Sequence, residues 1–134
     1  MILRRKRSSP QVQASFVAFR DVLEHLEPAK AALTEVMPTT RMPGRPLPDA
    51  LAEFEEGLRR AEGSMPGWRS AALEPEWSAC ERGLAEARDR ARRFREDAPE
   101  LVGFEGLIWA VEELMAPLDG FATAAERFRK LGAR

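Results

Sequence analysis

Apolar residues recur at steps of three and four along four segments of the chain, a spacing typical of amphipathic helices. The four helices are expected near residues 10–37, 49–62, 75–96 and 98–130. A connector rich in proline, residues 38–48, should separate the first two helices and follow an extended path. The last two segments are joined by a tight turn and should be antiparallel neighbours. The pattern predicts an all-α fold, an up-down-up-down four-helix bundle.

Two prolines inside these helices predict kinks, because proline lacks a backbone N–H and crowds the preceding turn. Pro28 lies inside the first helix, which should kink there or divide into two abutting helices. Pro117, followed by Gly120, should kink the last helix. Ser9 before a proline predicts the start of the first helix, and Asp97 with a proline two residues later predicts the start of the last one.

The most apolar stretch of the chain, residues 99–118, should be the element around which the others pack. At 100° per residue its core-facing residues share one broad face: Phe104, Leu107, Ile108, Val111, Leu114, Met115 and Leu118. Val102 and Trp109 are seven residues apart and lie outside that face, so a core within one chain does not account for them. We therefore expect them to form a contact patch for a partner.

Acidic residues follow one edge of this helix at heptad spacing: Glu105, Glu112, Asp119 and Glu126. Arg88 and Arg95 flank the seam of the preceding helix at the same spacing, and we expect them to pair with Glu105 and Glu112. The same acids admit a second interpretation, in which Glu105 or Glu112 lines a ligand or metal pocket between helices and Trp109 forms its wall.

The composition indicates one globular domain, which we place at residues 9–134. Of the 134 residues, 44% are hydrophobic and 32% are charged. The net charge of −1 creates no overall field that would attract nucleic acid or an anionic membrane. Residues 1–8 form a basic arm that should be disordered. Arginine far exceeds lysine and tyrosine is absent, which fits codon usage in a GC-rich bacterial genome.

No run approaches the ~18 apolar residues of a membrane span, and the basic N-terminus lacks the apolar segment of a secretory signal. A cytoplasmic location is therefore expected. Cys80 is the only cysteine and falls on the seam of the third helix, so it should be a small buried hydrophobe. His25 is the only histidine, lies beside the seam of the first helix, and should be a surface residue.

Motifs for phosphate, dinucleotide or zinc chemistry are absent from the sequence. Two carboxylate pairs at i,i+3 spacing, Glu53/Glu56 and Glu86/Asp89, resemble the acidic pairs with which MazG-like nucleotide pyrophosphohydrolases hold magnesium. The resemblance implies a magnesium-dependent nucleotide hydrolase, whereas the helical pattern turns all four acids away from the apolar seams. We expect no metal or organic cofactor.

The sequence thus favours a non-enzymatic helical bundle that binds a protein partner or associates with itself, most simply as a homodimer. It argues against nucleic acid as a partner and against a membrane span. The alternative is a small-ligand or metal-dependent enzyme with a carboxylate-lined pocket between helices.

Overall fold

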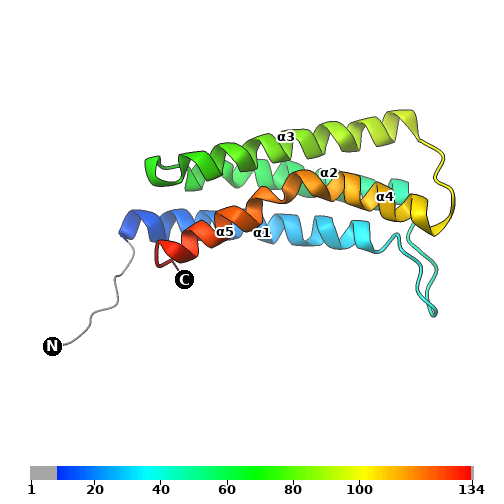
Figure 1. Cartoon of the computed structure of the whole chain (residues 1–134), viewed down its shortest axis with the longest axis horizontal. Coiled ribbons are helices and arrows are strands. Elements are labelled where there is room, and N and C mark those ends of the chain that lie inside the picture. Colours follow the sequence, from blue (N-terminus) through cyan, green and yellow to red (C-terminus); the bar gives the residue numbers. More distant parts are fainter. Residues whose placement is uncertain (1–8, 134) are drawn as a thin grey trace.

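The structure, a computed structural model, describes residues 9–133 and is built from helices (Figure 1). The α-helices are α1 (Pro10–Thr34), α2 (Leu47–Ser64), α3 (Glu74–Asp97), α4 (Gly103–Met115) and α5 (Gly120–Lys130). Short 3₁₀ turns join them: η1 (Met65–Trp68), η2 (Ala71–Leu73) and η3 (Ala116–Leu118). The expected basic arm, residues 1–8, lies outside the described residues.

The all-α, up-down-up-down four-helix prediction is confirmed, with α4, η3 and α5 together forming the fourth arm (Figure 1). The predicted kink in the last helix is confirmed and coincides with η3, which contains Pro117. Helix α1 continues through Pro28 as one element, so it does not divide into two. Its start matches the expected cap, because Ser9 Oγ accepts a hydrogen bond from the backbone N–H of Val12 at 3.1 Å.

The predicted start of the last helix at Asp97 is wrong. Asp97 is the final residue of α3, and Ala98 ends that helix in the left-handed conformation, with φ 40° and ψ 58°. The N–H of Ala98 still bonds to the carbonyl of Phe94, as expected at such a terminus. A stretch of irregular chain then follows, and α4 starts only at Gly103.

One apolar cluster draws side chains from every arm of the bundle. Its centre is aromatic, with the ring of Trp68 4.9 Å from that of Phe19 and 5.9 Å from that of Phe128. Trp68 is fully buried. The indole N–H of Trp77 donates to the Met65 carbonyl at 2.8 Å, which satisfies the polar atom of a second buried tryptophan.

The two ends of the bundle differ in how they are covered. The aromatic centre of the core lies near the end of the bundle that holds η1, η2 and the C-terminus (Figure 1). The opposite end holds the connections 35–46 and 98–102, and we call it the open end. The candidate site lies there. None of the helices within residues 9–133 combines the length and the apolar character needed to cross a membrane.

Candidate interaction surface at the open end

Helix α4 is strongly apolar, yet only Ala110 and Leu114 within it are buried. Val102, the residue before it, is 79% exposed, and Trp109 is 50% exposed. Both positions therefore lie away from the core, as their spacing indicates. Phe104 was predicted to face the core, but this is wrong, because it is 56% exposed. It falls in the first turn of the late-starting α4, where the neighbouring helices leave more than half of it uncovered.

Trp109 is the best anchored of these exposed residues. Its ring lies 5.5 Å from that of Phe94 on α3, at an interplanar angle of 46°. Trp109, Phe94 and Pro99 line a shallow groove of about 370 Å³ between α3 and α4. A tryptophan that is held on one face and open on the other is a common centre of protein interfaces, because little side-chain freedom remains to be lost on binding.

Glu105 and Glu112 lie on α4 and are both exposed. Neither carboxylate makes an ion pair or hydrogen bond with another residue in the range 9–133. The expected pairs with Arg88 and Arg95 are wrong. Those arginines reach α2 instead: Arg88 Nη1 lies 2.8 Å from Glu62 Oε2, and Arg95 donates to Glu55. They point to the α2 side of α3, away from α4.

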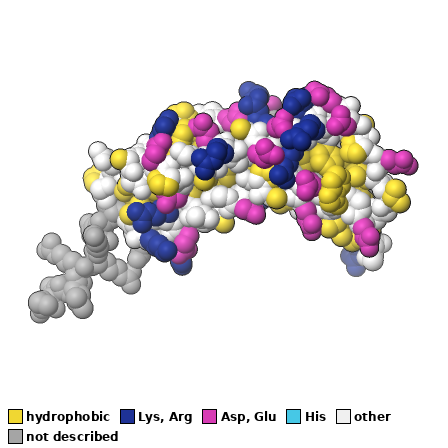
Figure 2. Space-filling view, turned by 45° about the horizontal axis from the view of Figure 1, so that its top comes forward, with side chains coloured by type: hydrophobic (Ala, Val, Ile, Leu, Met, Phe, Trp, Pro, Cys, Tyr) yellow, Lys and Arg dark blue, Asp and Glu magenta, His cyan; other side chains and the backbone are white. Residues whose placement is uncertain are grey.

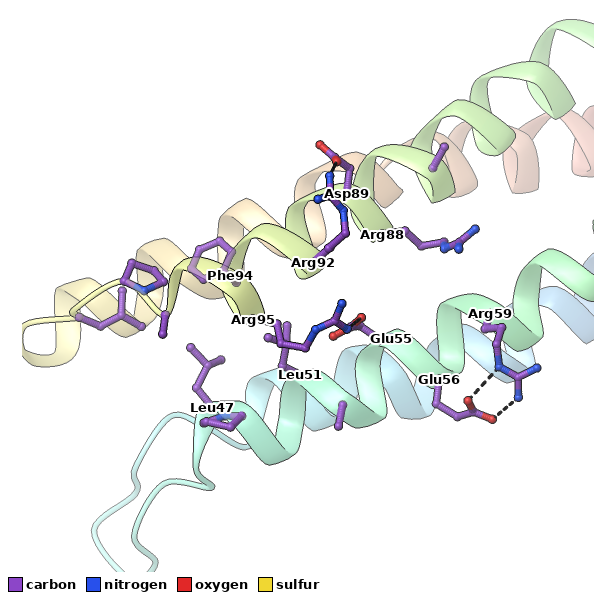
Figure 3. Close-up of a pocket in the computed structure, with 16 residues that line it drawn as sticks. Leu47, Leu51, Glu55, Glu56, Arg59, Arg88, Asp89, Arg92, Phe94 and Arg95 are labelled. Carbon is purple, nitrogen blue, oxygen red and sulfur yellow. Dashed lines mark hydrogen bonds and ion pairs between the residues drawn. The ribbon is translucent and has the colours of Figure 1, made fainter.

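The side of α3 that carries Arg88 and Arg95 forms a larger groove with α2, of about 870 Å³ (Figure 3). Its apolar lining comes from Leu47 and Leu51 at the start of α2, from Phe94, and from Leu101 in the connection to α4. Four arginines border it: Arg59, Arg88, Arg92 and Arg95. We call this the α2/α3 groove.

Two of the four acids in the MazG-like pairs, Glu56 and Asp89, also line the α2/α3 groove. Each is bound by arginines of its own helix. Hydrogen bonds from Arg59 to Glu56, and from Arg93 and Arg92 to Asp89, hold the pKa of both carboxyls below the usual range. Within residues 9–133 no three His, Cys, Asp or Glu side chains are grouped as metal ligands would be.

The remaining candidate residues are Cys80 and His25. Cys80 is buried, as predicted, and this burial, with a smaller effect of the Glu76 charge, raises the pKa of its thiol to about 12. The thiol is therefore protonated and unsuited to nucleophilic chemistry. His25 is partly exposed on α1, with Nε2 3.8 Å from Asp21.

Sequence reasoning found Val102 and Trp109 but missed Phe94, which lines both grooves. The spacing of apolar residues places Phe94 on the core seam of α3, but it is only partly buried. Arg92, Arg93 and Arg95 flank it at the end of the helix, and these neighbours were the available signal of a position near the surface.

In the space-filling view, apolar side chains gather toward the end of the molecule far from the grey residues, bordered by both basic and acidic groups (Figure 2). Apolar side chains and charges of both signs therefore adjoin on this surface, a composition common in protein interfaces. No protein-family model, no curated protein and no solved structure matches the chain.

Proposed function

We propose that the protein is an interaction module that associates with itself through the exposed face of α4. The observation that carries this proposal is the exposure of three large apolar side chains at the start of α4, Val102, Phe104 and Trp109, of which Val102 and Trp109 share one face. Single exposed apolar residues are ordinary, whereas several at one end of a small bundle are typical of an interface.

The energetics support an intermolecular role for this face. Complete burial of a Val or Phe side chain is worth about 1.5–3 kcal/mol. Because the three side chains are 79%, 56% and 50% exposed, about two side-chain equivalents remain to be buried on each copy. Their burial would supply roughly 3–6 kcal/mol per copy toward the net of about 8 kcal/mol that a micromolar dimer needs. The pair Trp109 and Phe94 would be its centre.

The enzyme alternative has less support. Glu105 and Glu112, its proposed acids, line neither of the two grooves. Glu56 and Asp89 do line the larger groove, but their carboxylates are occupied by arginines.

Sedimentation velocity over a range of concentrations tests the proposal. The wild type should show a concentration-dependent dimer, and Val102→Glu and Trp109→Glu should each weaken it by about tenfold or more, as expected for interface anchors. Val17→Glu is the matched control, because Val17 is 67% exposed on α1, outside the surface at issue. It should leave the dimer unchanged. A wild type that stays monomeric at all concentrations contradicts self-association.

A further inference from the structure

The α2/α3 groove is an open apolar site that the described chain does not fill. It measures about 870 Å³, within the usual range of ~300–1,000 Å³ for clefts that enclose a ligand or an anchoring side chain. Leu47 and Leu101, which line the groove, are only partly buried. Both lie at the open end of the bundle. In Figure 3 the labelled side chains come from both facing helices, with Leu47 and Leu51 on one side and Phe94 on the other.

Two ion pairs connect α2 to α3 beside this groove. Arg95 pairs with Glu55. About two helical turns earlier on α3, Arg88 pairs with Glu62. Such exposed pairs contribute only about 0.2–1 kcal/mol each, so they align the helices without closing the space between them. Each guanidinium has five N–H donors and uses only part of them here, so the arginines can still bind further carboxylates.

Helix α4 has the complementary character. It contains Glu105, Glu112 and Glu113 and no Lys, Arg or His. Of these, Glu105 and Glu112 have no partner among residues 9–133, and they lie on the helix that exposes Phe104 and Trp109. The groove lining carries four arginines against three acids, Glu55, Glu56 and Asp89, and this small positive excess complements an apolar helix with an unpaired acidic edge.

Both surfaces lie at the open end of the bundle, on two sides of the end of α3. Phe94 and Pro99 line both the α2/α3 groove and the α3/α4 groove, so the two surfaces adjoin at the end of α3. In a dimer with a two-fold axis near this point, α4 of each copy would bind the α2/α3 groove of the other copy. Such an isologous contact closes at two copies.

From these observations we infer that the α2/α3 groove receives the exposed face of α4 from a second copy of the chain. The inference rests on the proposed self-association and adds the surface of the second copy that binds α4. The Val102 and Trp109 side chains of one copy contact Leu47, Phe94 and Leu101 of the other, and the unpaired glutamates meet the arginines at the border of the groove. Two such contacts per dimer would have to cover about 800 Å² on each copy, roughly a tenth of its 8878 Å² accessible surface.

The first test fills the groove without disturbing the core. Ala52 is exposed on α2 and lines the groove, so Ala52→Trp places an indole in it while retaining a folded helix. We expect this variant to weaken the dimer by at least about tenfold. Ala122→Trp, at an exposed alanine of α5, is the matched control and should leave the dimer constant unchanged. Circular dichroism of both variants confirms that each is folded.

The second test is complementation. Ala52→Trp has a blocked groove and an intact α4, whereas Val102→Glu has an impaired α4 and an intact groove. Each variant alone should dimerise at least about tenfold more weakly than the wild type, but their mixture should form a heterodimer with one intact α4–groove contact, detectable with two fluorophores. A symmetric contact between two α4 helices predicts no such recovery, so its absence overturns the inference.

The outcomes separate the two proposals. If Val102→Glu and Trp109→Glu weaken the dimer while Ala52→Trp does not, the groove assignment is wrong and self-association through α4 stands. If the wild type is monomeric, both fail.

Discussion

The guanidinium of Arg90 on α3 donates a hydrogen bond to the backbone carbonyl of Glu113 on α4, with Nη1 2.8 Å from the oxygen. In a regular helix that carbonyl would accept from the N–H of residue 117. Residue 117 is proline and has no N–H to give, so Arg90 supplies the missing donor. A side chain of one helix therefore satisfies the backbone defect that kinks its neighbour.

Arg90→Met should destabilise the protein by about 1–2 kcal/mol, because it keeps the aliphatic stem but leaves the Glu113 carbonyl without its charged donor. Urea unfolding followed by circular dichroism measures the change. Arg93→Met is the control: Arg93 bonds only to acids of its own exposed helix surface, and its loss should cost less than about 0.5 kcal/mol.

Pro117→Ala provides the decisive comparison, since alanine restores an N–H at residue 117. In that background Arg90→Met should cost about 1 kcal/mol less than in the wild type, a coupling measurable by a double-mutant cycle. Equal costs in the two backgrounds would show that Arg90 does not compensate for the proline.

Gly83→Ala should destabilise the protein by about 1–3 kcal/mol, even though Gly→Ala within a helix normally stabilises. A Cβ at Gly83 would overlap the carbonyl oxygen of Pro117, so α3 and the kink could no longer approach as closely. Gly63→Ala is the matched change in α2, where a Cβ meets nothing within 4 Å, and it should stabilise by up to about 1 kcal/mol. Thermal unfolding of the two variants should shift in opposite directions, and shifts of the same sign would contradict the close contact.

The apolar pattern was sufficient to predict the helices and their order, because burial of seams such as Leu51, Phe54 and Leu58 is what brings the helices together. It could not select ion-pair partners. Glu55 and Glu62 on α2 have the same seven-residue spacing as the two acids on α4, so spacing alone leaves the partners of the α3 arginines undetermined.

The open end was the part that the sequence predicted least well. The α3 terminus depends on Ala98 in a left-handed conformation, and alanine carries no signal for it. The late start of α4 then moved Phe104 out of the core. The groove between α2 and α3 is a result of packing in three dimensions that no single segment reveals.

Ala98→Gly should stabilise the protein by up to about 1 kcal/mol, because glycine adopts the left-handed conformation without the Cβ strain that alanine pays. At Ala85, an exposed position inside α3, the same substitution should destabilise by about 1 kcal/mol. Chemical unfolding of the two variants should give changes of opposite sign. A loss of stability at both positions would show that Ala98 is not strained.

The Cys80 thiol should make the stability of the protein fall at alkaline pH. Burial raises its folded pKa to about 12, whereas an unfolded chain has a cysteine pKa of about 8.5. Between these values the unfolded chain loses the proton and the folded protein retains it, so the stabilising contribution is fully present below about pH 8.5 and declines as pH rises. The slope approaches about 1.4 kcal/mol per pH unit, measurable by urea unfolding between pH 7.5 and 10.5. Cys80→Ala should remove this dependence, and a thiol reagent at pH 8 should modify the wild type only as fast as the protein unfolds. Rapid modification under native conditions would show that the thiol is accessible and its pKa ordinary.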